Sequence, residues 1–155
     1  MDRVIGIDAG LNGALAFLSE DGLLVERMPV ISIGKKKRID LNALEGIMLL
    51  WQPSIAIIEE AQVMPNQGSV SGFTIGFNYS SLITALYMMR IPTEEVRPTA
   101  WKKALRVSAN KDDCRYRAQQ LFPNNASDFS KKSDDGLAEA ALLTYYYKTR
   151  GNLWS

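Results

Sequence analysis

One segment constrains the fold more than any other: the apolar run Ile55-Ala56-Ile57-Ile58, which Ser54 precedes and Glu59 ends. The run has the length of a strand and offers no polar side chain to either face. Strands of this kind belong to sheets that helices cover on both sides. Helical periodicity flanks the run over residues 41–51, with Asp40 as the expected N-cap, and over residues 73–90. The pattern therefore predicts an α/β domain.

The other segments extend this prediction to a complete sheet. Three short apolar runs separated by turn signals open the chain and predict a meander of three antiparallel strands. Two further strands make the sheet mixed and five-stranded, with helices on both faces. The ribonuclease H-like fold has this order of elements, although order alone does not separate it from other small mixed-sheet domains. The predicted strands are 3–8, 13–19, 23–28, 54–59 and 93–96; the predicted helices are 41–51, 73–90, 99–105, 111–121 and 134–148; residues 61–71 and 124–133 are predicted loops.

Composition limits the chemistry of the chain. With 155 residues, 46% of them hydrophobic, the chain is expected to form one domain over residues 1–155. No apolar run reaches about 18 residues and no signal-peptide pattern opens the sequence, so a cytoplasmic protein is expected. The single Cys114 and the absence of histidine exclude an internal disulfide, a zinc cluster and imidazole catalysis. Any chemistry that the chain performs must therefore use carboxylates, lysines, hydroxyls or backbone groups.

Carboxylates occur where predicted elements begin or end. Asp8 ends the first strand and Glu59 ends the central one, where α/β sheets tend to bind ligands. Asp134, Asp135 and Glu139 fall in the first two turns of the last helix, and the last two are four residues apart on one face. Each has a simpler reading: a turn aspartate, a solvated strand end, or acidic residues that favour a helix N-terminus. Glu139 fits this reading least, because it lies within the apolar run 137–143 and a charge there needs a partner.

Two to four converging carboxylates without histidine suit Mg²⁺ or Mn²⁺. Paired ions of this kind hold both the attacking and the leaving oxygen of a phosphodiester, which suggests phosphoryl chemistry on nucleic acid. The net charge of +1 conceals basic clusters that are compatible with such a partner without requiring one. Lys111, Lys102 and Lys103 are candidates for phosphate contacts, although helix lysines are more often simply solvated. Gly68, Gly72 and Gly76 are expected to loosen a loop that could lie along a nucleic-acid backbone.

Four segments together resemble the RuvC-like Holliday junction resolvases, most of all the small versions that bacteriophages carry. They are Ile5-Gly6-Ile7-Asp8-Ala9-Gly10, the stretch from Ile57 to Gly68, Pro98-Thr99-Ala100-Trp101-Lys102-Lys103, and Asp135-Gly136-Leu137-Ala138-Glu139-Ala140-Ala141-Leu142. The resemblance spans nearly the whole chain in the right order. It implies a ribonuclease H-like fold, a homodimer, and Mg²⁺-dependent nicking of two opposed strands of a four-way DNA junction, with two ions per site, no nucleotide cofactor and no membrane. A phage-encoded member would act in the host cytoplasm.

The resemblance also implies roles for individual residues. Asp8, Glu59, Asp135 and Glu139 correspond to the metal-binding carboxylates, with Asp134 a competing ligand, and Lys111 is a candidate for stabilising developing charge. Gln62 stands where cellular members carry a junction-opening aromatic, so Phe73 or Phe77 takes that role or the junction is held differently. The predicted DNA-binding residues are Lys35, Lys36, Lys37, Arg38, Gln67, Phe73, Phe77, Lys102 and Lys103. The basic run 35–38 is either a DNA-binding hairpin or a solvated loop, and its place on the connection after the third strand favours the hairpin.

Several alternatives stay open at this stage. A ribonuclease H or a debranching nuclease has the same fold, and a non-catalytic junction-binding module requires no metal site. Asp8-Ala9-Gly10 also resembles a phosphate loop of the actin-like ATPases, but those proteins need two such domains. The predicted helix over residues 73–90 has more apolar positions than one core-facing stripe requires. The surplus serves either a dimer interface or burial on two sides within the monomer.

Overall fold

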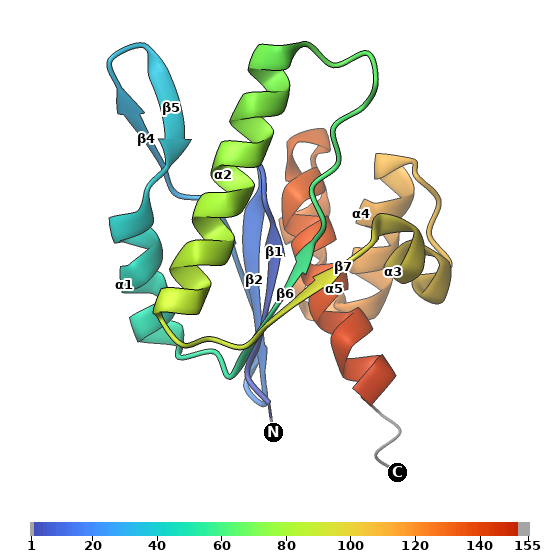
Figure 1. Cartoon of the computed structure of the whole chain (residues 1–155). Coiled ribbons are helices and arrows are strands. Elements are labelled where there is room, and N and C mark those ends of the chain that lie inside the picture. The colour runs from blue at the N-terminus through green and yellow to red at the C-terminus, as the bar shows by residue number, and fades with distance from the viewer. Residues whose placement is uncertain (1, 152–155) are drawn as a thin grey trace.

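The computed structural model describes residues 2–151, and a five-stranded sheet forms its centre (Figure 1). The strand order is β3-β2-β1-β6-β7, where β1 is Val4–Asp8, β2 Ala14–Ser19, β3 Gly22–Arg27, β6 Ile55–Glu59 and β7 Thr93–Val96. The first three strands pair antiparallel, whereas β6 and β7 continue the sheet in parallel from β1. This sheet confirms the predicted mixed α/β architecture.

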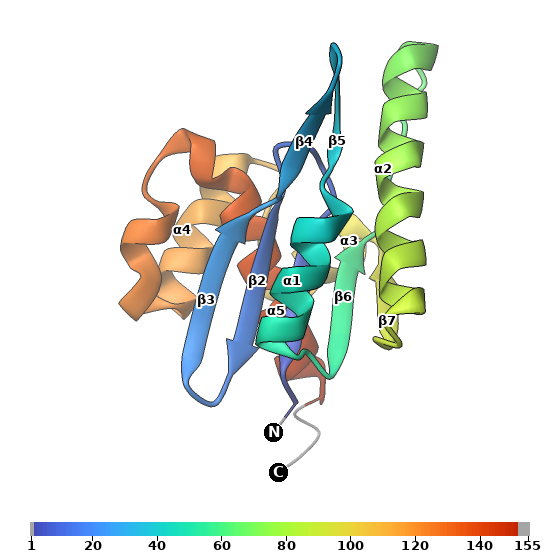
Figure 2. The ribbon, with the colours of Figure 1, turned by 90° about the vertical axis from the view of Figure 1, so that its left-hand side faces the viewer.

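Helices cover both faces of the sheet (Figure 2). On one face lie α1 (Leu41–Trp51) and α2 (Ser69–Met88); on the other lie α3 (Pro98–Leu105), α4 (Lys111–Leu121) and α5 (Asp135–Gly151). The central run explains this layering, because Ile58 belongs to the core under α1 and α2, whereas Ile57 belongs to the core under the later helices. Both side chains are fully buried, as a strand without a polar face requires. No helix within residues 2–151 is long and apolar enough to cross a membrane.

Helix α5 lies unusually close to β1, and Gly6 makes this possible. A Cβ atom at Gly6 would stand 2.1 Å from the carbonyl oxygen of Ala140 and 2.9 Å from Cγ2 of Thr144. Only a residue without a side chain admits a helix backbone at this distance. The contact lays the first turns of α5 over the carboxyl end of β1, so that a Cβ at Gly136 would stand 3.0 Å from Oδ2 of Asp8.

The long helix α2 begins earlier than predicted. It starts at Ser69 rather than near residue 73, and Gly68 is its N-cap. Gly72 and Gly76 therefore lie inside a helix, and the prediction that they loosen a loop is wrong. Val63 of the preceding loop packs against this extra turn and supports it. Its Cγ1 would be 3.3 Å from a Cβ atom at Gly72.

The basic run 35–38 lies in a hairpin, which is the structure favoured for it over a solvated loop. Residues 30–39 form a separate hairpin of β4 (Val30–Ile33) and β5 (Lys36–Ile39), with Gly34 in the left-handed region at the turn. The predicted loop 124–133 contains two short 3-10 helices, Pro123–Phe129 and Lys132–Asp134, and the last helix runs from Asp135 rather than from residue 134. Figure 1 shows the hairpin and the N-terminal end of α2 at the end of the molecule to which β1 and β6 run.

Candidate active site

Carboxylates from three elements meet beyond the carboxyl ends of β1 and β6. Asp8 ends β1 and Glu59 ends β6, and the two strands pair in parallel with Ile7 opposite Ile58. Side chains two apart on a strand share a face. Asp8 therefore lies on the face of Gly6, which α5 contacts, and Glu59 on that of Ile57. Glu139, one turn into α5, belongs to the same face of the sheet.

The electrostatics of Asp8 show that these groups share one site. Burial and the negative charges of Glu139 and Glu59 together raise the pKa of Asp8 to about 7, against the opposing effect of Lys111 and Lys102. A carboxyl group that holds its proton near neutral pH is typical of functional sites where like charges are brought together. The structure therefore brings Asp8, Glu59, Glu139 and Lys111 together as the sequence predicts, with Lys102 beside them.

Glu59 has a fixed hydrogen-bond partner. The indole Nε1–H of Trp101, at the start of α3, donates to Glu59 Oε2 at 2.6 Å. Burial raises the pKa of Glu59, this hydrogen bond lowers it, and the charge of Glu139 raises it again. The neighbouring Glu60 pairs instead with Arg97, at 3.6 Å between Oε2 and Nε, and lies outside this arrangement. Sequence reasoning placed Trp101 in a motif but assigned it no role.

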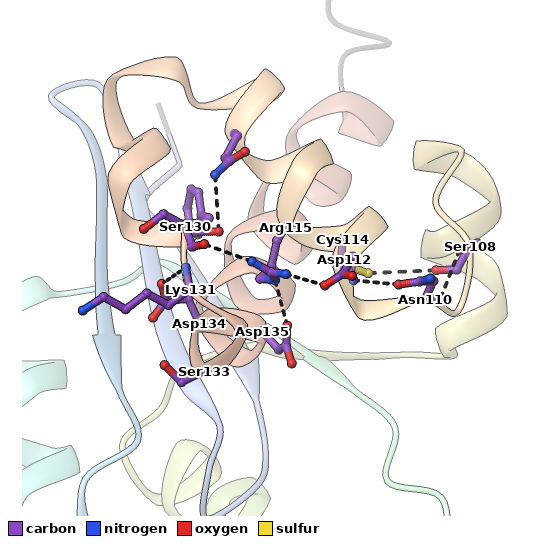
Figure 3. Close-up of polar contacts among 12 residues, drawn as sticks. Ser108, Asn110, Asp112, Cys114, Arg115, Ser130, Lys131, Ser133, Asp134 and Asp135 are labelled. Carbon is purple, nitrogen blue, oxygen red and sulfur yellow. Dashed lines mark hydrogen bonds and ion pairs between the residues drawn. The ribbon is translucent and has the colours of Figure 1, made fainter.

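Asp134 and Asp135 are adjacent in sequence, but their carboxylates have different partners (Figure 3). Arg115 of α4 brings its Nε to 3.2 Å from Oδ1 of Asp135, while its guanidinium also pairs with Asp112 and donates to the carbonyl of Ser130. Asp134 is buried, and its two oxygens accept from Arg27 and from the backbone N–H of Lys131, each at 2.8 Å. This arrangement favours Asp135 over Asp134 as a ligand.

A cleft of about 720 Å³ opens beside Asp8. Asp8, Asp135 and Lys111 line it, whereas Glu59 and Glu139 do not. Sequence reasoning missed several of its other residues, because they come from turns and from β3, which carry no chemical motif. The remaining lining residues are Gly10, Leu11, Asn12, Gly13, Arg27, Met28, Val30, Lys132, Ser133 and Gly136.

The donor set fits a hard divalent cation. Every candidate ligand is a carboxylate, and Mg²⁺ and Mn²⁺ prefer oxygen. A cation beside Asp8 would also relieve the repulsion from Glu59 and Glu139 that raises the pKa of Asp8. Within residues 2–151, no three acidic side chains already surround one point at ligand distance. The carboxylates would therefore have to converge by changes of rotamer when an ion binds.

The predicted DNA-binding residues fall into two groups. Lys36, Lys37 and Arg38 of the hairpin face Phe73 and Phe77 of α2 across a groove of about 520 Å³, and the two phenylalanine rings stack with centroids 6.0 Å apart. Lys35 is exposed beside them, in the hairpin turn. Near the active site, the Lys102 ammonium lies 5.2 Å from the centre of the Trp101 ring, and Lys103 is exposed. Gln67 instead accepts from the backbone N–H of Met64 in its own loop and donates to the hydroxyl of Ser71 in the first turn of α2.

Comparison with known proteins adds to this geometry. No protein-family model matches the chain. The crossover junction endodeoxyribonuclease RuvC of Rickettsia typhi is 28% identical over 106 residues, which are 67% of this chain and 64% of that protein. The chain therefore aligns with less than two thirds of this relative's length.

The fold is similar to solved resolvase structures. Thermus thermophilus RuvC, in complex with a Holliday junction substrate, superposes with a TM-score of 0.66 at 14% identity, covering 97% of each chain. The yeast mitochondrial Holliday junction resolvase superposes with a TM-score of 0.58 at 15% identity, covering 94% of this chain and 77% of its own. These similarities confirm the predicted resemblance and the predicted fold.

The contact between Arg115 and Asp135 leads to a first testable prediction. Arg115→Gln leaves Asp135 without its cationic partner, so we expect a lower melting temperature and weaker Mn²⁺ binding. Arg115→Lys should have a melting temperature and an Mn²⁺ affinity between those of Arg115→Gln and the parent. Calorimetric melting and Mn²⁺ titration measure the two effects. Arg106→Gln, which changes an exposed arginine of the same charge, is the control. Equal Mn²⁺ affinity in Arg115→Gln and the parent would contradict a role for Arg115 in holding Asp135.

Proposed function

We propose that the chain is a Holliday junction resolvase, a metal-dependent endonuclease that makes paired nicks in four-way or branched DNA. The observation that carries the proposal is the meeting of Asp8, Glu59 and Glu139, from β1, β6 and α5, in one electrostatic site with Lys111 and Lys102. Catalytic carboxylates at the carboxyl ends of sheet strands suit phosphodiester hydrolysis. The similarity to RuvC of Rickettsia typhi and of Thermus thermophilus supports the same conclusion.

The carboxylates and Lys111 have different roles in the proposed reaction. Asp8, Glu59 and either Asp135 or Glu139 would hold the two Mg²⁺ or Mn²⁺ ions. When bound, the ions supply an activated water and stabilise the leaving oxygen. Lys111 is exposed at the cleft beside Asp8, where its ammonium group would bind a phosphate oxygen and stabilise the charge that develops during in-line attack. Asp8 must lose its proton before it can accept a cation.

The decisive experiment is cleavage of a labelled four-way junction in Mg²⁺, beside linear duplex and RNA–DNA hybrid. We expect symmetrical paired nicks in the junction alone, and loss of these nicks in Glu59→Gln. Glu20→Gln, at a surface turn, is the matched control and should cleave like the parent. Preferential cutting of the hybrid would identify a ribonuclease H. Tight junction binding without cutting in Mg²⁺ or Mn²⁺ would identify a binding module instead.

The basic hairpin is proposed to hold DNA phosphates at the groove that it forms with α2. Replacing Lys36 and Lys37 by glutamine removes two cations, so we expect weaker junction binding and a plot of log affinity against log salt flatter by about 1–2 units. The control is the double variant Arg3→Gln with Arg90→Asn, which removes the same charge from exposed residues outside the groove. Fluorescence anisotropy over a salt series measures both slopes. An unchanged slope in the hairpin variant would exclude phosphate contacts there.

A homodimer is proposed to form through the surplus apolar face of α2. Burial on two sides within the monomer does not account for this helix, because Phe73 is 73% and Met88 71% exposed. These two residues, with Leu41 and Phe77, line an apolar groove of about 510 Å³. Exposed apolar surface of this extent is typical of interfaces. Met88→Lys should shift the protein toward monomer in sedimentation, whereas Leu50→Lys, at a 79% exposed position of α1, should not. A parent that stays monomeric at micromolar concentration with and without DNA would refute the dimer.

A further inference from the structure

Trp101 and Glu59 form a contact that the proposed reaction does not by itself explain. Trp101 is fully buried, and the one donor of its side chain is directed at one carboxylate oxygen, Oε2 of Glu59, at 2.6 Å. The two residues lie 42 positions apart in sequence, on α3 and at the end of β6. The hydrogen bond engages Oε2, and no hydrogen bond to Oε1 of Glu59 is found among residues 2–151.

The indole ring is held firmly from several directions. Trp101 lies in the core that also contains Ile57, Val96 and Leu105, so its ring packs against the sheet that carries Glu59. On the polar side, the Lys102 ammonium stands 5.2 Å from its ring centre, which is within cation–π range. A ring that is buried and packed on several sides can orient a carboxylate in a way that an exposed surface side chain cannot.

We propose that Trp101 is a positioning residue, which holds Glu59 by one oxygen so that the other is presented to a divalent cation shared with Asp8. The inference rests on the proposed metal-dependent function. Partners that orient a ligand in this manner usually change metal affinity about 10- to 100-fold when they are removed. The contact has a second consequence, because a cation bound at Glu59 changes the electric field at the indole ring. Trp101 fluorescence should therefore report metal binding directly.

The first test uses this fluorescence in the full-length protein without DNA. Trp51→Phe together with Trp154→Phe leaves Trp101 as the sole tryptophan. Titration with Mg²⁺ should change the intensity or wavelength of its emission in a saturable manner. The change should disappear when Glu59→Gln is added. A saturable signal that survives Glu59→Gln, or Mg²⁺ binding by calorimetry with no signal from Trp101, would overturn the inference.

The second test separates positioning from packing. Trp101→Phe keeps an aromatic ring and removes the N–H, and we expect Mn²⁺ affinity, measured by the electron paramagnetic resonance of the free ion, to fall about 10-fold or more. Trp51→Phe is the matched control, since Trp51 stacks on Phe17 at 5.4 Å between ring centres, and it should bind Mn²⁺ like the parent. Thermal melting checks that Trp101→Phe is folded at the assay temperature; if it is not, the fluorescence test decides alone.

The outcomes distinguish this inference from the proposed function. Equal Mn²⁺ affinity in the parent and in folded Trp101→Phe would overturn the positioning role and leave the nuclease proposal standing. A parent that binds neither Mg²⁺ nor Mn²⁺ would overturn both. Weakened Mn²⁺ binding in Trp101→Phe with normal binding in Trp51→Phe would support the role of Trp101, whatever DNA the protein cleaves.

Discussion

Asp8→Asn is expected to abolish junction cleavage and, in metal-free buffer at pH 8, to melt at a higher temperature than the parent. Cleavage should fall by at least about a thousandfold, the scale on which loss of an essential electrostatic group acts. The gain in stability follows from removal of a buried charge near Glu59 and Glu139. The raised pKa of Asp8 corresponds to a penalty of at most about 4 kcal/mol for holding this residue ionised in the folded protein.

The stability difference should depend on pH in a defined direction. Burial and the neighbouring carboxylates raise the pKa of Asp8 from 3.8 to about 7 in the folded protein. Between these values the folded state binds more protons at Asp8 than the unfolded state does, so this residue makes the parent less stable as the pH rises. The advantage of Asp8→Asn should therefore be absent near pH 3, grow between pH 4 and 7, and stay constant above pH 8.

Calorimetric melting of the two proteins at several pH values, with a chelator present, measures this effect. Asp21→Asn, at an exposed turn, is the control and should match the parent at every pH. Added Mg²⁺ should stabilise the parent but not Asp8→Asn, because ligands that bind only the folded state raise its stability. An Asp8→Asn protein that melts below the parent at pH 8 without metal would show that the ionised Asp8 does not destabilise the folded protein.

Gly6→Ala is expected to destabilise the protein severely. The new Cβ atom would stand 2.1 Å from the carbonyl oxygen of Ala140, and a backbone atom in a helix cannot turn aside as a flexible side chain can. Helix α5 would have to move away from the sheet, at a cost of about 3 kcal/mol or more. In a domain of this size the loss corresponds to a fall in melting temperature of roughly 6–12 °C.

Gly46→Ala is the matched control for Gly6→Ala. Gly46 lies inside α1, and a Cβ atom there would meet nothing within 4 Å. Replacing a helical glycine by alanine stabilises by about 0.5–1 kcal/mol, so this variant should melt higher than the parent. Any Gly6→Ala protein that folds should also bind Mn²⁺ more weakly, because α5 carries Asp135 and Glu139. Normal stability of Gly6→Ala in denaturant titrations would contradict the close contact of α5 with β1.

The strands and most helices could be predicted because their signals are local. The run 55–58 is apolar at every position, and the structure buries Ile57 toward one layer of helices and Ile58 toward the other. The hairpin over residues 30–39 was expected only around its basic run, and its strands were not predicted, since they are short and exposed and depend on pairing with each other. The start of α2 was misplaced because Ser69-Val70-Ser71-Gly72 has weak helix propensity, and contact with Val63 supports the first turn.

Only part of the candidate active site could be predicted from the sequence. Asp8 and Glu59 were identified because each directly follows a buried strand. Asp134 and Asp135 could not be told apart, since both stand at the start of one helix. The two differ in partners that lie elsewhere in the chain. Arg27, 107 positions away, pairs with Asp134, and Arg115 of α4 pairs with Asp135.

The sequence by itself determined the α/β class, the order of most elements along the chain and the carboxylates that end β1 and β6, because hydrophobic periodicity and strand ends depend on residues close together in the chain. Only the tertiary structure decided how close α5 lies to Gly6, which acidic groups share the field at Asp8, and which oxygen of Glu59 is taken by Trp101. Electrostatic and hydrogen-bonding effects act across a few ångströms of space, and the residues concerned are brought within that range only when the helices pack on the sheet.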